Sequence, residues 1–202
     1  MLPVQVVCFD LGGVMIQIHH EWEGALSAAG FPVPKPVGPL GGFPEFDLYQ
    51  KGAVSEEGFL AGLARHLDLA GLREARKVHM AILQEAYPGV DTLVAELVDR
   101  GIVCGCLSNT NALHWETFFD GGRYAYGPSL SVRIGSHLVG ANKPDESIYE
   151  AFERDCGFRG SQVAYFDDGP ANVAAAKARG WQSWLIDAKG DPAVQMRSAL
   201  GL

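Results

Sequence analysis

The sequence is poor in basic residues, and no stretch of it gathers them. Lysine and arginine together number 16 against 24 aspartate and glutamate residues, so the formal net charge is −8. Nucleic acids and anionic membrane surfaces attract proteins that cluster positive charge. The charge balance therefore predicts that neither is a partner of this chain.

Long apolar runs and paired cysteines are also missing. No apolar run approaches the ~20 residues of a membrane-spanning helix, and the first residues lack the basic segment that begins a signal peptide. The four cysteines, Cys8, Cys104, Cys106 and Cys156, form no Cys-x-x-Cys pair and no cluster with the spacing of zinc ligands. We therefore expect free, mostly buried thiols in a cytoplasmic protein.

Short apolar runs alternate with amphipathic segments over most of the 202 residues. The runs typical of buried strands are 4–9, 102–107, 163–166 and 181–186, with weaker candidates near 130–134. Segments with helical periodicity are 91–100, 110–119, 145–155, 171–179 and 192–200. This alternation predicts an α/β fold, a doubly wound parallel sheet with helices on both of its faces.

One stretch interrupts the alternation. Helices are expected at 19–29, 55–67 and 71–86, and the segment 31–46 holds five prolines and is expected to be irregular. Since no strand is expected in this stretch, we interpret it as an all-helical cap domain inserted into an α/β core. The predicted domains are a core of residues 1–15 and 89–202 and a cap of residues 16–88.

Three of the predicted strands end in polar residues. Asp10 follows the first strand, Ser108 and Asn109 follow the second, and Asp167 and Asp168 end the third. The carboxyl ends of parallel strands share one edge of a sheet, where open α/β folds bind ligands. Carboxylates that meet there need a cation to stay ionised, and oxygen ligands suit Mg²⁺. Singly, each residue is typical of a helix cap or a turn, so the prediction depends on their joint occurrence.

Lys143 is a further candidate for the same site. It lies in the sequence Asn-Lys-Pro-Asp, just ahead of a predicted helix. A lysine at that position can hold a phosphate group as a point charge beside the acidic cluster. Taken alone, it would be a solvated surface lysine.

These segments resemble the motifs of the haloacid-dehalogenase-like hydrolase superfamily. Val-Cys-Phe-Asp-Leu-Gly-Gly-Val at 7–14 resembles the first motif, and Cys-Leu-Ser-Asn at 106–109 resembles the second. Lys143 with Pro144 resembles the third, and Tyr-Phe-Asp-Asp at 165–168 resembles the fourth. The four occur in the order typical of the superfamily, and the resemblance spans almost the whole chain, with the weakest match in the cap.

The resemblance implies a Mg²⁺-dependent phosphatase that acts on a small phosphorylated metabolite, such as a sugar phosphate. It implies that Asp10 is a nucleophile that forms an aspartyl-phosphate. Ser108, Asn109 and Lys143 would bind the substrate, and Lys143 would also neutralise charge during transfer. The implied metal ligands are Asp10, the backbone carbonyl of Gly12, Asp167 and Asp168.

One position departs from the superfamily pattern. Its phosphatases usually carry a second aspartate two residues after the nucleophile, as general acid and base, and this chain has Gly12 there. A histidine could replace that group, and His19, His20 and His114 follow the first two motifs.

A 2-haloacid dehalogenase needs neither this acid nor a metal, but it would want an arginine soon after the nucleophile, and none is present. A catalytically impaired binding protein with the same fold is a third hypothesis. Phe43, Phe46 and Tyr49 are expected either in the substrate pocket or in the core of the cap.

Overall fold

The core of the molecule is a parallel sheet. The computed structural model describes residues 4–33 and 35–202. Residues 1–3 and 34, which the sequence analysis assigned to the core domain and to the irregular part of the cap, lie outside the described residues. Within these ranges, five parallel strands lie in the order β5 (Val132–Gly135), β4 (Val103–Ser108), β1 (Val6–Phe9), β6 (Val163–Asp167) and β7 (Gln182–Leu185). The predicted doubly wound α/β fold is confirmed.

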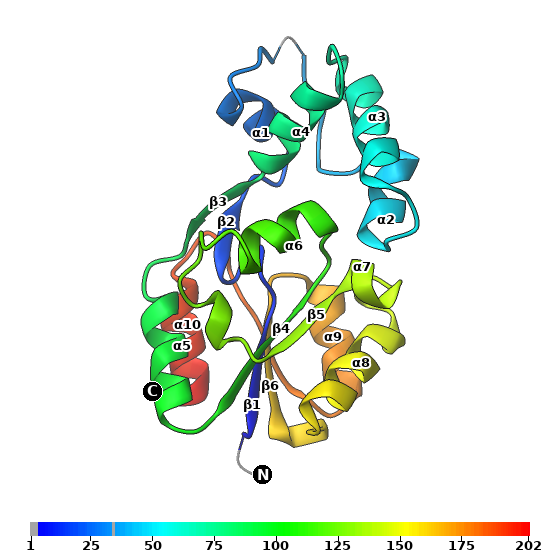
Figure 1. Cartoon of the computed structure of the whole chain (residues 1–202). Helices are drawn as coiled ribbons and strands as arrows, with labels where there is room; N and C mark the ends of the chain where they lie inside the picture. Colours follow the sequence, from blue (N-terminus) through cyan, green and yellow to red (C-terminus); the bar gives the residue numbers. More distant parts are fainter. Residues whose placement is uncertain (1–3, 34) are drawn as a thin grey trace.

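Helices cover both faces of this sheet, as Figure 1 shows. One face carries α5 (Val90–Asp99) and α10 (Pro192–Leu200), and the other carries α8 (Glu146–Cys156) and α9 (Pro170–Ala178). All four residues of β1 are buried, because side chains alternate between the two layers. Val7 and Phe9 pack in the cluster that includes α5, whereas Val6 and Cys8 pack in the cluster that includes α8.

Shorter elements complete the core domain. They are α6 (Ala112–Phe119), α7 (Ser136–Val139) and two 3₁₀ turns at Gly127–Ser129 and Gly160–Gln162. The side chain of Asn111 accepts a hydrogen bond from the backbone N–H of His114 and so caps α6. All four cysteines are free, as expected, and three of them are buried. No helix in the described ranges is both long and apolar enough to cross a membrane.

The segment between β1 and α5 begins and ends with a strand. β2 (Ile16–Ile18) pairs antiparallel with β3 (Leu83–Ala86), and the four helices between them lie beyond this two-stranded ribbon (Figure 1). They are α1 (Trp22–Ala28), α2 (Pro44–Gln50), α3 (Glu56–Leu67) and α4 (Leu72–Met80), and we call them the helical insert. The prediction of an all-helical stretch is wrong, because both of its ends are strands. These strands of three and four residues are too short to show an alternating pattern.

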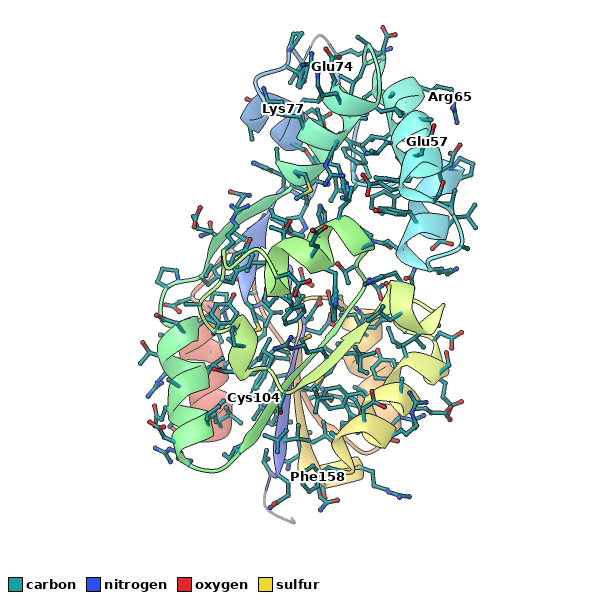
Figure 2. All side chains as sticks on the ribbon, viewed as in Figure 1. Glu57, Arg65, Glu74, Lys77, Cys104 and Phe158 are labelled. Carbon is teal, nitrogen blue, oxygen red and sulfur yellow. The ribbon has the colours of Figure 1, made fainter. Side chains whose placement is uncertain are left out.

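The four helices do not follow the predicted boundaries throughout. The predicted single helix over 71–86 ends at Met80, and the segment expected to be irregular contains the start of α2, with Pro44 in its first turn. The insert has its own apolar core, in which Trp22, Phe59 and Leu63 are fully buried. Charged side chains lie around its outside, as Figure 2 shows for Glu57, Arg65, Glu74 and Lys77.

Candidate active site

Three carboxylates meet at the carboxyl edge of the parallel sheet. Asp10 directly follows β1, and its backbone N–H donates to the carbonyl of Phe166 at 2.8 Å. Asp167 is the last residue of β6, and Asp168 follows it. One carboxylate oxygen from each of the three aspartates lies within 4.8 Å of the other two. The register of the two central strands therefore brings these side chains together.

Lys143 is the cation of this cluster. Its Nζ lies 2.9 Å from Asp10 Oδ1 and 2.7 Å from Asp167 Oδ2, and it donates to the carbonyl of Leu107 at 2.9 Å. These three contacts use every N–H donor of the ammonium group. Burial by itself lowers the pKa of Lys143, but the charges of Asp10 and Asp167 outweigh burial and raise it. The side chain is therefore a fixed positive charge in a buried site.

Asp167 is saturated with hydrogen bonds. Its Oδ2 accepts from Lys143 and from the hydroxyl of Tyr165. Its Oδ1 accepts from the backbone N–H of Gly169 at 2.7 Å and from the side-chain amide of Asn172 at 2.9 Å. Burial acts to raise the pKa of Asp167, but Lys143 and these donors outweigh burial and lower it. A carboxylate has about four acceptor positions, and all four of them are occupied here.

Asp168 and Asp10 stand in a different environment. Among the described residues, no lysine, arginine or histidine lies within ion-pair distance of Asp168, and burial together with the charge of Asp167 raises its pKa. Burial also raises the pKa of Asp10, to about 7, with a further rise from Asp167 and Asp168 and an opposing effect of Lys143. One ammonium thus faces three carboxylates. This excess of oxygen ligands and negative charge fits a divalent cation such as Mg²⁺.

Gly12 and Gly13, in the loop after Asp10, differ in whether the structure requires a glycine. Gly13 has a φ of 76°, and a Cβ there would lie 2.3 Å from Asp168 Oδ2, so only glycine fits. Gly12 is not in the left-handed region, and the nearest atoms to a Cβ there belong to the Ile18 side chain, whose Cδ1 would lie at 2.9 Å. The close approach of the loop to Asp168 therefore requires Gly13 and not Gly12.

Ser108 and Asn109 lie on the next strand end. Ser108 is the last residue of β4 and is buried. Asn109 holds the backbone of Lys143: its side-chain amide donates to the Lys143 carbonyl at 3.1 Å, and its oxygen accepts from the Lys143 N–H at 2.6 Å. All the residues predicted for the site thus lie along one edge of the sheet. The contact between Asn109 and Lys143 was not predicted.

A cavity of about 100 Å³ adjoins this edge, between the core and the helical insert. Gly12, Ser108 and Asn109 line it from the core, and Phe46 and His79 line it from the insert. Of the other residues considered from the sequence, His114 also lines it, whereas His19, His20, Phe43 and Tyr49 are not among its lining residues.

His79 is one of several lining residues that the sequence analysis did not name. It is buried on the inner face of α4, together with Ala75 and Val78 at helical spacing. A histidine within such an apolar stripe is the signal that was available in the sequence.

Comparison with known proteins finds a matching family and a relative of similar length. Residues 4–180 match the family described as haloacid dehalogenase-like hydrolase. The phosphatase MT3486 of Mycobacterium tuberculosis (strain CDC 1551 / Oshkosh) is 27% identical over 215 residues, which span 99% of this chain and 96% of that protein.

Solved structures share the fold. The HAD family enzyme bt-2542 of Bacteroides thetaiotaomicron, in complex with magnesium and inorganic phosphate, superposes with a TM-score of 0.77 at 19% identity, covering 96% of this chain and 100% of that one. L-2-haloacid dehalogenase from Xanthobacter autotrophicus gives a TM-score of 0.66 at 17% identity, covering 98% and 84%. At such identities, the likeness concerns the fold alone.

Proposed function

Because the chain belongs to the haloacid dehalogenase-like hydrolases, we propose that it is a Mg²⁺-dependent phosphatase for a small phosphorylated metabolite, such as a sugar phosphate. The observation that carries the proposal is the cluster of Asp10, Asp167 and Asp168, whose oxygens lie within 4.8 Å of one another beside a single ammonium group. The name of the phosphatase relative and the magnesium and phosphate bound to bt-2542 support the same function.

Asp10 is the nucleophile in this proposal. One of its carboxylate oxygens bonds to phosphorus as the bond from phosphorus to the leaving oxygen breaks. Water then cleaves the aspartyl-phosphate, which releases phosphate and restores the carboxylate. Lys143 keeps Asp10 oriented, through the contact of 2.9 Å, and stabilises negative charge on the transferring group. The hydroxyl of Ser108 would donate to a phosphoryl oxygen, and Asn109 would keep Lys143 in place.

The three acidic residues would not contribute equally as metal ligands. Asp10, Asp168 and the backbone carbonyl of Gly12 would hold Mg²⁺, which supplies positive charge to the phosphoryl oxygens. Asp167 belongs to the same group, but a direct bond to the metal would displace one of its four donors. We therefore assign Asp167 mainly to the positioning of Lys143, with Asp168 as the stronger ligand.

The helical insert would select the substrate. We assign residues 1–15 and 89–202 to the catalytic core and residues 16–88 to a cap domain that closes over the cavity. The supporting observation is that the insert supplies Phe46, Gln50 and His79 to the lining. The chemistry then depends on the core, and the shape of the leaving group depends on the cap.

The test is a screen of small phosphate esters and 2-haloacids with and without Mg²⁺. We expect hydrolysis of p-nitrophenyl phosphate that EDTA abolishes and added Mg²⁺ restores. Beryllium fluoride with Mg²⁺ should inhibit the enzyme as a mimic of the aspartyl-phosphate. Phosphatase activity that survives EDTA unchanged would contradict the metal role.

A 2-haloacid dehalogenase is the second candidate, and Gly12 is the observation that favours it. Halide leaves without a proton, so a dehalogenase needs no acid at that position. Asp168, which has no cationic partner within ion-pair distance among the described residues, favours the phosphatase, because attack on carbon needs no cation. In the screen, release of chloride from 2-chloropropionate without Mg²⁺ would support the dehalogenase. Absence of turnover on both classes would favour the impaired binding protein.

A further inference from the structure

The helical insert contacts the core at a second place, away from the ribbon of β2 and β3. The end of α2 lies beside α7, on the right of Figure 1, whereas the ribbon lies on the left. Gly52, just after α2, has a φ of 65°, and a Cβ there would lie 2.5 Å from the backbone oxygen of His137 in α7. Only glycine permits this approach, because a backbone oxygen cannot move aside as the end of a flexible side chain can. The insert is therefore docked closely on α7.

One hydrogen bond of this contact leads directly to Lys143. The side-chain amide of Asn142, the residue before Lys143, donates to Oδ1 of Asp47 in α2 at 2.8 Å. The backbone of Lys143 is held by the side chain of Asn109. The segment that carries the ammonium group is thus held from two sides, by Asn109 of the core and by Asp47 of the insert.

A second hydrogen bond leads to the loop after β4, which begins with Asn109. Ser136 in α7 is fully buried, and its hydroxyl accepts from the backbone N–H of Thr110 at 2.9 Å. The same hydroxyl lies 2.6 Å from the backbone oxygen of Gln50 in α2 and 2.9 Å from that of Thr110. A hydroxyl has one proton, and the shorter distance favours Gln50 as its acceptor. Ser136 therefore connects the insert with the loop after β4.

A third contact reaches the loop after β4 from α4 of the insert. Nε2 of His79 lies 3.2 Å from the side-chain oxygen of Asn111, which also accepts from the backbone N–H of His114 at 3.2 Å. The rings of His79 and His114 stack, with centroids 4.0 Å apart and planes 7° apart. Nε2 of His114 donates to the backbone oxygen of His79 at 3.0 Å. Both of the loops beside the acidic cluster are therefore held by the insert as well as by the core.

We propose that docking of the insert positions Lys143 and the loop after β4 for phosphoryl transfer, and that Asp47 is a positioning residue that acts on Lys143 through Asn142. The catalytic groups themselves still belong to the core, because the contacts of the insert lie one step behind them. A displacement of about 1 Å at such a contact can lower a rate by about 10²-fold. The inference rests on the proposed phosphatase function, since it concerns the alignment of groups for that reaction.

Hydrolysis of p-nitrophenyl phosphate at saturating Mg²⁺ tests the role of Asp47. Asp47→Ala removes the acceptor of Asn142, and we expect kcat to fall about 10-fold. The Mg²⁺ concentration for half-maximal activity should stay the same, because Asp168 is untouched. The matched control is Lys51→Gln, since Lys51 pairs with the other oxygen of Asp47, Oδ2, at 2.8 Å, and it should keep the wild-type kcat. An equal loss in both variants, or no loss in Asp47→Ala, overturns the role of Asp47.

A double-mutant cycle shows whether the effect passes through Asn142. Asn142→Ala alone should also lower kcat about 10-fold. The double variant with Asp47→Ala should lose about as much as either single variant, since both changes remove the same hydrogen bond. Losses that multiply to about 100-fold would mean that the two residues act separately, and would overturn the connection.

Gly52→Ala tests the docking as a whole. Its Cβ would meet the backbone oxygen of His137, so the insert should move away from α7 and kcat should fall at least as far as in Asp47→Ala. The control is Gly122→Ala, because Gly122 has nearly the same φ, 66°, but no atom within 4 Å of a Cβ among the described residues. It introduces similar backbone strain without the contact and should leave kcat unchanged. Equal losses in the two glycine variants count against the proposal.

Amide hydrogen exchange gives a measurement that needs no turnover. The Lys143 N–H donates to the side-chain oxygen of Asn109 at 2.6 Å, and its exchange with solvent reports how firmly that segment is held. We expect exchange at least about 10-fold faster in Asp47→Ala than in the wild-type protein, and unchanged exchange in Lys51→Gln. Unchanged exchange in both variants contradicts the positioning role. Absence of turnover in the wild-type protein would contradict the phosphatase function instead, so the two failures can be told apart.

Discussion

The acidic edge and the neighbouring cavity differ in the charge of the side chains that form them. At the edge, Lys143 and Asp167 have all their hydrogen-bonding positions filled, and every charge comes from the core domain. In the cavity, the described lining carries no charged side chain. The difference teaches that the charged groups are fixed in advance by contacts within the core, whereas the cavity offers only neutral groups to a guest. The two regions can therefore be perturbed independently.

The strongest disturbance of the acidic edge is Asp10→Asn. The amide is nearly isosteric and can still accept from Lys143, but it is a poor nucleophile, so we expect turnover to fall by roughly 10⁴-fold or more. Thermal unfolding should change little. Hydrolysis of p-nitrophenyl phosphate and a melting curve check both points. Full activity in the variant would remove Asp10 from the mechanism.

The absence of an acidic side chain at Gly12 should affect how strongly the rate of hydrolysis depends on the leaving group. We expect the wild-type enzyme to hydrolyse aryl phosphates about 10²–10⁴-fold faster than alkyl phosphates, because an alkoxide needs a proton that Gly12 cannot give. The measurement is log kcat/KM against leaving-group pKa. A flat plot with chemistry rate-limiting would show that another residue supplies the proton.

A gain of function tests the same position. Gly12→Asp requires a shift of the Ile18 side chain but no unusual backbone, and we expect it to raise hydrolysis of alkyl phosphates relative to aryl phosphates. The control is Gly13→Asp, which should abolish activity because its Cβ would overlap Asp168. A loss that is equal for both ester classes in Gly12→Asp would argue against an acid role at this position.

Within the acidic edge, substitutions of Asp167 and Asp168 should have different effects on activity. Asp168→Asn should raise the Mg²⁺ concentration for half-maximal activity by roughly 10–100-fold. Asp167→Asn should mainly lower kcat at saturating Mg²⁺, since Lys143 loses the negative charge of its partner at 2.7 Å. Titrations of activity with Mg²⁺ give both quantities. The division of roles fails if Asp167→Asn has the larger effect on the Mg²⁺ requirement.

The smallest expected effect concerns the stacked histidines and pH. Burial lowers the pKa of His114 to about 4 and that of His79 well below its ordinary value. The unfolded chain, with histidine pKa values near ~6.5, therefore binds more protons than the folded one as pH falls from about 6.5 towards 4. Each group removes at most about 1.4 kcal/mol of stability per pH unit in that window.

Melting curves check this pH effect. Between pH 7.5 and 5, the wild-type protein should lose more melting temperature than His114→Gln, which has no proton to gain there. Other titrating groups are shared by the two proteins, so the difference between the curves isolates the imidazole. Parallel curves would mean that His114 titrates in the folded state as it does in the unfolded chain.

The sequence predicted the three central strands well, since each is a nearly continuous apolar run such as 4–9 or 163–166. The edge strands gave a weaker signal, since Arg133 interrupts β5 and β7 begins with Gln182 and Ser183. The sequence also indicated the site, because Asp10 and Asp168 follow such runs and strand ends share an edge. The ribbon of β2 and β3 was missed, since its strands of three and four residues leave no readable period. The position of His79 in the cavity lining was missed because only the fold brings it near Asn111 and His114.

The two-stranded ribbon has a consequence for how the chain is assembled. Ile16 and Ala86 are paired across it, so the segment that carries the helical insert leaves the core and returns to it at neighbouring points. For the core, the insert is topologically equivalent to the turn of a hairpin, and its length adds little to the entropy of closing the loop. We therefore expect that the insert can be exchanged for one from a relative at this junction, leaving the strand order and the acidic edge in place.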